Sequence, residues 1–155
     1  MIDLSRLSLL WSTLGPIGRI PFAPGTWGSL FAVLLAPWCL TPLPWPGRIG
    51  VVLCLILISG LAAGKAEALL GQKDPGSVVI DEFCGLWLAL APFSDLGFAQ
   101  YAGALALFRL FDILKPWPVK ASEQWIPGGF GVIIDDLLAG IYTALVLLIW
   151  KLIVS

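Results

Sequence analysis

The side chains best suited to chemistry are five carboxylates that occur in three places along the chain. They are Asp81 with Glu82, Asp112, and Asp135 with Asp136. Each place lies at the edge of an apolar run, where a charge is costly and usually serves a function. Because the chain has ten acidic residues in all, these places account for half of them. Several hard oxygen ligands without any histidine favour binding of Mg²⁺ or a similar cation.

The absence of histidine and the spacing of the cysteines exclude several classes of enzyme. A chain without histidine has no histidine nucleophile, no histidine general base and no histidine-dependent phosphatase chemistry. Cys39, Cys54 and Cys84 occur singly, so they suggest neither a metal site nor a disulfide framework. None has an arginine six residues later, as a cysteine phosphatase would need to hold its anion. Acid–base chemistry must therefore come from carboxylates, Lys, Tyr or metal-bound water.

Residues 24–29 (PGTWGS) combine glycines with hydroxyl groups, and we expect them to form a loop before a helix. Glycines let a backbone approach a ligand closely, and a helix N-terminus attracts anions. Thr26 and Ser29 can donate hydrogen bonds to phosphate. The alternative interpretation is an ordinary N-cap that leads into an apolar helix.

Two cations flank Asp112. Arg109 and Asp112 are three residues apart and share a helical face, with Lys115 near the same side. This spacing fits a metal-binding aspartate whose neighbouring cations hold phosphate. The alternative is an interfacial salt bridge whose cations extend toward water. The adjacent acidic pairs have an alternative too, since the helix macrodipole favours acids at a helix start.

The composition is typical of an all-α integral membrane protein. Hydrophobic residues make up 59% of the 155 residues and charged residues 12%, about half of the roughly 25% usual in soluble domains. The length predicts a single domain, residues 1–155. A formal net charge of −1 without a basic run gives no reason to expect nucleic-acid binding.

Apolar runs between polar turns predict about five membrane-associated helices. The expected helices cover residues 29–43, 49–64 with an extension to 70, 78–93, 98–114 and 132–154. Several are shorter than the roughly 20 residues of an untilted span, so we expect some to project beyond the lipid or to be shielded. An amphipathic helix with Leu4, Leu7 and Trp11 on one face precedes them, either on the membrane surface or as an ordinary packing helix. The eight tryptophans are interpreted as interfacial anchors.

Counting the crossings brings the motifs to one membrane face. If the N-terminus is cytoplasmic, seven basic residues fall inside and only Arg48, in a turn, and Lys151 fall outside, as the positive-inside rule requires. In this topology residues 24–29 open at the inner face, and so does each acidic motif. The sequence therefore predicts one site at the cytoplasmic surface, built from four separate motifs.

These four motifs together resemble the phosphatidylglycerophosphatase A family of bacterial membrane lipid phosphatases. The matching stretches are APGTWGSL at 23–30, DPGSVVIDEFCG at 74–85, FRLFDILKPWP at 108–118 and GGFGVIIDDLLAG at 128–140. They occur in the family order and span most of the chain. The resemblance implies Mg²⁺-dependent removal of phosphate from phosphatidylglycerophosphate, which gives phosphatidylglycerol. It also implies a multi-pass protein of the bacterial inner membrane whose active site faces the cytoplasm.

The resemblance, taken with the motifs, assigns three groups of candidate residues. The metal candidates are Asp81, Glu82, Asp112, Asp135 and Asp136. The phosphate-binding candidates are Gly25, Thr26, Ser29, Arg109 and Lys115. The catalytic candidates are Asp81, Asp135 and Asp136, and we expect the last two to supply the base. Attack by metal-activated water and an aspartyl-phosphate intermediate both fit these residues.

Three other functions are compatible with parts of the sequence. A cation-coupled transporter could use the same carboxylates, although its site is expected near mid-membrane. A cytidine-diphosphate-dependent phosphotransferase also uses Asp-rich helices and Mg²⁺, but its glycine-alanine-arginine-punctuated signature is absent here. A non-catalytic assembly protein is the remaining alternative, and it would keep its function after mutation of Asp81 or Asp136.

Overall fold

The structure, a computed structural model, describes residues 4–154. Their regular secondary structure is entirely helical, with no β-strand among them. The α-helices in chain order are α1 (Leu4–Ser12), α2 (Pro24–Cys39), α3 (Trp45–Leu70), α4 (Ile80–Leu90), α5 (Phe98–Leu114), α6 (Val119–Ser122) and α7 (Gly129–Val154). A single 3₁₀ turn, η1 (Ile17–Arg19), separates α1 from α2. The predicted all-α class is thus confirmed.

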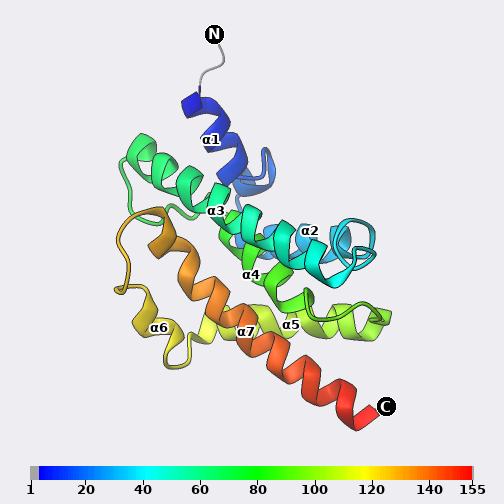
Figure 1. The fold of residues 1–155 in the computed structure, drawn as a ribbon. Coiled ribbons are helices and arrows are strands. Elements are labelled where there is room, and N and C mark those ends of the chain that lie inside the picture. The colour runs from blue at the N-terminus through cyan, green and yellow to red at the C-terminus, as the bar shows by residue number, and fades with distance from the viewer. Residues whose placement is uncertain (1–3, 155) are drawn as a thin grey trace.

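Helix α4 forms the centre of the fold. It packs against α2, α3, α5 and α7 (Figure 1), and nine of its 11 residues are buried. A helix that is apolar on all sides is typical of a core position. At about 1.5 Å per residue it is about 16 Å long, too short to cross a bilayer alone. The other helices therefore shield α4, as expected for the shorter predicted runs.

Within the described residues, α3 and α7 are the two helices that are long and apolar enough to cross a membrane. Each has 26 residues. Their outer faces expose large apolar side chains such as Leu57 and Leu61 on α3 and Ile149 and Leu152 on α7. Apolar surface of this extent is unusual on a soluble monomer and indicates association with a membrane.

Glycines allow α4 and α7 to lie in backbone contact. A Cβ atom on Gly140 would lie 2.2 Å from the carbonyl oxygen of Gly85, and one on Gly85 would lie 2.4 Å from that of Asp136. No side chain fits into gaps this small, so only glycine is compatible with the observed spacing. The close approach of the two helices thus depends on these small residues. It brings Asp136 against the beginning of α4.

Three helices begin earlier than the sequence predicted. Helix α3 begins at Trp45 instead of residue 49, and the other two are α2 and α7. The expected loop at residues 24–29 forms the first turns of α2, with Pro24 at the first helical position, where a missing N–H costs nothing. Helix α7 begins at Gly129 instead of residue 132, so Asp135 and Asp136 lie in its second turn and not its first. Glycine has a low helix propensity, so the glycine-rich sequences at the beginnings of α2 and α7 did not predict a helix. Tertiary packing outweighs this propensity in the folded protein.

Arg48 and Trp87 also differ from the predictions. Arg48 lies in the first turn of α3 and is buried, with its guanidinium donating to the carbonyl oxygens of Leu43 and Ala91. Trp87 is buried and donates its indole N–H to the Ala32 carbonyl oxygen at 2.9 Å, which joins α4 to α2. Six of the other tryptophans are exposed, as expected of interfacial anchors.

We expect Gly140→Ala to lower the free energy of unfolding by about 1–3 kcal/mol, because the added methyl group forces α4 and α7 apart. The measurement is thermal unfolding of the detergent-solubilised protein, followed by tryptophan fluorescence. Gly50→Ala is the matched control, since a Cβ at this helical position in α3 meets no atom within 4 Å. Equal midpoints for the two variants would contradict the proposed role of the glycine contact.

Candidate active site

The predicted site residues come together at one end of the helices. Helices α2, α4 and α7 begin there, and α5 ends there (Figure 1). Arg109 on α5 contacts Glu82 on α4, and Lys115 after α5 contacts Asp135 on α7. Gly25 lies against Glu82, since a Cβ at Gly25 would be 1.9 Å from Glu82 Oε1. All four sequence motifs thus contribute to one cluster.

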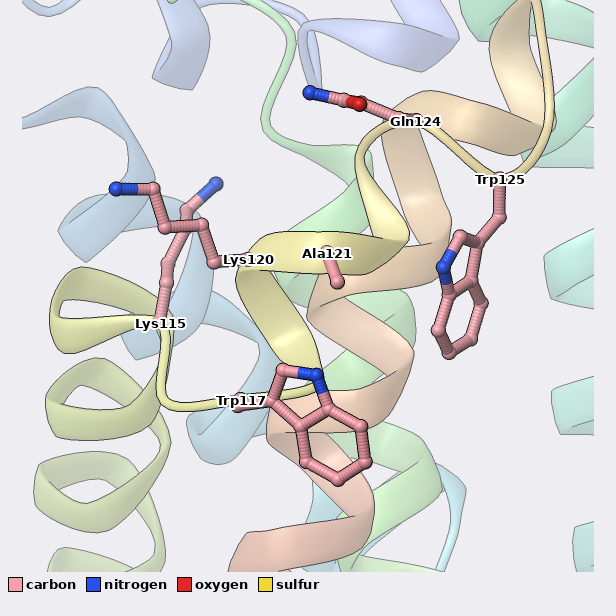
Figure 2. A pocket seen from close by; sticks show the side chains of 6 residues that line it. All are labelled: Lys115, Trp117, Lys120, Ala121, Gln124 and Trp125. Carbon is pink, nitrogen blue, oxygen red and sulfur yellow. The ribbon is translucent and has the colours of Figure 1, made fainter.

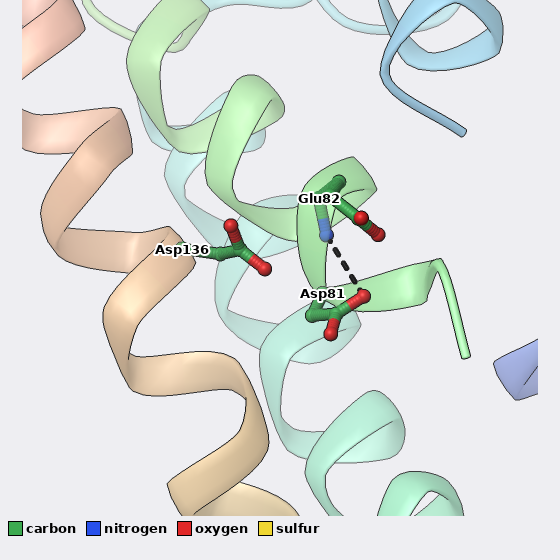
Figure 3. A group of neighbouring side chains, drawn as sticks. All are labelled: Asp81, Glu82 and Asp136. Carbon is green, nitrogen blue, oxygen red and sulfur yellow. Dashed lines mark hydrogen bonds between the residues drawn. The ribbon is translucent and has the colours of Figure 1, made fainter. Parts of the chain in front are cut away.

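Three carboxylates form the centre of this cluster. Asp81, Glu82 and Asp136 each offer one oxygen, and the three oxygens lie within 4.8 Å of one another. Figure 3 shows Asp136 extending from α7 toward the beginning of α4, where the Asp81 Oδ1 atom accepts the backbone N–H of Glu82. Asp81 and Asp136 are only 5% and 4% exposed. This geometry suits oxygen coordination of a divalent cation.

Unpaired atoms in this group support the same interpretation. The buried Oε2 of Glu82 and Oδ1 of Asp136 have no hydrogen-bond partner within residues 4–154. Burying a carboxylate oxygen without a partner costs on the order of several kcal/mol of free energy, because the oxygen loses its solvation by water. Three neighbouring carboxylates also repel one another. A bound cation would offset both costs, so the donor set fits Mg²⁺.

Arg109 joins the carboxylate group to Asp112. Its Nη1 atom lies 2.6 Å from Asp112 Oδ2 and 3.5 Å from Glu82 Oε1. Arg109 and Asp112 therefore lie on one face of α5, as predicted, and form an ion pair. Asp112 also lies beside Asp136. The buried Nε of Arg109 has no partner in the described chain, so this guanidinium keeps a free donor.

Lys115 forms a second ionic bridge. Its Nζ atom lies 2.6 Å from Asp135 Oδ2 and 2.6 Å from Glu123 Oε1. Lys115 ends α5 in a left-handed conformation, with φ 44°, directly before Pro116. Partial burial lowers the pKa of Lys115, but the hydrogen bonds to the two carboxylates raise it more, so its pKa lies above the ordinary value. The side chain therefore stays cationic at neutral pH.

Glu123 was not among the predicted site residues. It is the one acidic residue between Lys115 and Asp135 in the sequence. This isolated position was the signal in the sequence that could have identified it as a site residue. The two acids of the predicted pair also have different surroundings. Adjacent helical residues point about 100° apart, so Asp135 reaches Lys115 while Asp136 faces Asp81 and Glu82.

The three predicted phosphate-binding residues of α2 have different surroundings. Gly25 is buried beside Glu82, and a Cβ there would lie 3.0 Å from Arg109 Nη1. Thr26 is exposed at the helix start. Ser29 is buried, and its hydroxyl donates to the Gly25 carbonyl oxygen at 2.8 Å. The Ser29 hydroxyl is thus used within its own helix, whereas Gly25 forms part of the wall of the cluster.

The chain is similar to known lipid phosphatases over most of its length. A protein-family model for phosphatidylglycerophosphatase A matches residues 10–151. Phosphatidylglycerophosphatase A of Haemophilus influenzae is 41% identical over 135 residues, which cover 83% of this chain and 79% of that protein. The protein of the same name from Escherichia coli is 37% identical over 128 residues, 82% of this chain and 73% of that protein.

A third relative has a description that names a different substrate. A Bacteroides thetaiotaomicron protein, provisionally described as a phosphatidylinositol-3-phosphatase, is 36% identical over 157 residues. The match covers 97% of this chain and 98% of that protein. No solved structure matches the chain.

We expect Asp136→Asn to weaken divalent-cation binding about tenfold or more, because it removes a charged oxygen from the three-carboxylate group. Binding is measured as free Mn²⁺ by electron paramagnetic resonance on the detergent-solubilised protein. Asp95→Asn is the control, since Asp95 is exposed in the turn after α4, at the opposite end of that helix. Unchanged affinity in Asp136→Asn would rule out this cluster as the cation site.

Proposed function

The chain belongs to the phosphatidylglycerophosphatase A family, and from this membership we propose that it removes the terminal phosphate of phosphatidylglycerophosphate in a Mg²⁺-dependent reaction. The product would be phosphatidylglycerol. As a member of this family the chain is a phosphatase, which acts on a phospholipid in or at a membrane. The observation that carries the metal-dependent mechanism is the group Asp81, Glu82 and Asp136, with two buried oxygens that lack partners.

Asp81, Glu82 and Asp136 would hold Mg²⁺, and Asp112 and Asp135 would support them from their ion pairs with Arg109 and Lys115. When bound, Mg²⁺ supplies charge neutralisation at phosphoryl oxygens and acidifies a coordinated water. The charge balance supports this role. The five predicted acids exceed the two cations that contact them, so the cluster without a metal would carry excess negative charge that repels a phosphate.

Two cations of the chain would orient the phosphoryl group. Arg109 presents an unpaired Nε beside Glu82, and a guanidinium can bind two phosphate oxygens at once. Lys115 stays protonated, because its pKa lies above the ordinary value, so it acts as a fixed positive charge and not as the acid. Gly25 leaves open the space beside Glu82 and Arg109 that a side chain would fill.

Asp136 is the residue that we assign as the base. Its Oδ1 atom is buried without a partner, whereas the Asp135 carboxylate is bonded to Lys115. As base, Asp136 would take a proton from the attacking water while the bond from phosphorus to the glycerol oxygen breaks. The leaving oxygen gains a proton from solvent. The alternative route, with an aspartate as the nucleophile, uses the same residues.

We further propose that the chain is a multi-pass protein of the bacterial inner membrane with its active site toward the cytoplasm. Helices α3 and α7 are long enough to span, and α2, α4 and α5 would complete a bundle of about five membrane-associated helices. The excess of basic residues on the loops at the site end supports this orientation. Helix α1 would lie at the membrane surface, where Leu4 and Leu7 are exposed.

A cation-coupled transporter is the alternative function that uses the same carboxylates. Its site would be expected near the middle of the membrane, between broken helices. Asp81 and Glu82 instead begin α4, and the cations around them suit an anionic substrate. The relative described as a phosphatidylinositol-3-phosphatase makes inositol phospholipid phosphate a substrate to include in the test.

We expect purified wild-type protein in detergent to release phosphate from phosphatidylglycerophosphate only with Mg²⁺, and faster than from phosphatidylinositol 3-phosphate. Asp136→Asn should lower kcat about a hundredfold or more, because it removes both the base and a metal ligand. Phosphate release is measured colorimetrically, before and after metal removal with EDTA.

The control for this assay is Asp95→Asn, which should keep wild-type kcat because Asp95 lies at the opposite end of α4 from the site. Absence of phosphate release from any lipid by folded wild-type protein would refute the phosphatase proposal and favour the transporter. Faster release from the inositol lipid would keep the reaction but change the substrate.

A further inference from the structure

A hollow of about 680 Å³ opens beside the candidate active site. Its lining comes from the end of α5 and from the segment that contains α6 (Figure 2). The lining residues are Lys115, Trp117, Lys120, Ala121, Gln124 and Trp125. We call this feature the basic hollow, because its charged lining residues are two lysines and none is acidic.

Lys120 supplies charge that the rest of the chain does not neutralise. Its side chain is exposed, and no carboxylate within residues 4–154 forms an ion pair with it. Lys115 differs, since its ammonium group is bonded to Asp135 and Glu123. Gln124 adds an amide donor on the same wall (Figure 2). The basic hollow therefore suits an anion that Lys120 can contact directly.

Two tryptophans indicate that this anion belongs to a lipid. Trp117 is 82% exposed and Trp125 is 54% exposed, and both line the basic hollow. Exposed indole rings in a membrane protein favour the depth of the lipid headgroups. The Tyr142 hydroxyl donates to the Trp117 carbonyl oxygen at 2.9 Å, which fixes this segment to α7. Lys120 lines the same hollow as these two rings, so its charge lies near the depth at which headgroup phosphates are found.

Lys115 connects the basic hollow to the carboxylate cluster. Its side chain lines the hollow, and its Nζ bonds to Asp135, the neighbour of Asp136 in α7. The substrate of the proposed function has two phosphates. The terminal monoester is removed, and a phosphodiester joins the same glycerol to diacylglycerol. A lipid with its monoester at the carboxylate cluster would need a second anion site nearby, toward the lipid.

We propose that the basic hollow binds the phosphodiester group of the substrate and that Lys120 selects lipids that carry this second phosphate. This inference rests on the proposed function and names the part of the substrate that determines specificity. Lys120 acts here as a binding residue and takes no part in bond cleavage. Its removal should therefore change KM and leave kcat unchanged.

The experiment compares two lipids in neutral detergent micelles with Mg²⁺. Phosphatidylglycerophosphate has both phosphates, and phosphatidic acid has only the monoester. We expect Lys120→Gln to raise KM for phosphatidylglycerophosphate about tenfold, the loss expected for one charge-assisted hydrogen bond, with kcat and the KM for phosphatidic acid unchanged. Lys120→Arg should restore most of the affinity. Lys65→Gln is the matched control, because Lys65 is an exposed lysine on α3 outside the basic hollow.

A binding measurement separates this proposal from the proposed function. Dihexanoyl phosphatidylglycerol has the phosphodiester and no monoester, and calorimetry should show about tenfold weaker binding to Lys120→Gln than to wild type. This result is independent of hydrolysis, so it holds even if wild type releases no phosphate and the phosphatase proposal fails. Equal affinity of the two proteins for this lipid would overturn the assignment.

Two further outcomes would also overturn it. A KM increase of the same size for both lipids would mean that Lys120 contacts the monoester, or that it acts only through the overall charge of the protein surface. Displacement of dihexanoyl phosphatidylglycerol by an equal concentration of inorganic phosphate would assign the basic hollow to free phosphate instead of a lipid headgroup.

Discussion

The structure depends on the concentration of carboxylate charge where α4 meets α7. Asp81, Glu82 and Asp136 are held within a few ångströms in a largely apolar protein, and two of their oxygens are buried without a hydrogen-bond partner. Cations around such a group stabilise its charged form. The chain supplies Arg109 and Lys115 at the edges of the cluster, and in the proposed function a metal would occupy its centre. Metal binding and stability of the fold would then be coupled at this one place.

The remainder of the fold keeps α4 in position against this repulsion. At the site end, glycine contacts hold α4 on α7 with no side chain between them. At the other end, Arg48 donates to the carbonyl oxygen of Ala91 just after α4 and to that of Leu43 before α3. In between, Trp87 is bonded to the backbone of α2. A short core helix is thus fixed at three points, which keeps its first turn in register with α5 and α7.

Much of this arrangement could be predicted from the sequence, because apolar runs alternate in direction and bring every second loop to the same side. The convergence of residues 24–29, Asp81, Asp112 and Asp136 followed from that counting, and α5 was predicted with its observed bounds. Helix starts at Pro24 and Gly129 were missed, because glycine-rich segments become helical only through packing contacts that no local pattern shows. The sequence did not show that Asp135 and Asp136 have different partners, because this depends on the rotation of α7 about its axis. The contact of Glu123 with Lys115 was not predictable either, because it depends on the path of the loop after α5.

The distribution of the site over the chain also determines when the site can exist. Glu82 and Asp81 are synthesised long before Asp136, and the last helix closes the cluster. A chain whose synthesis or insertion stops before α7 has the first two carboxylates without the third, and without the glycine contact that holds them. The complete group of three carboxylates thus exists only once α7 has packed against α4. Under the proposed function, a molecule that lacks α7 would therefore have no complete metal site and would be inactive.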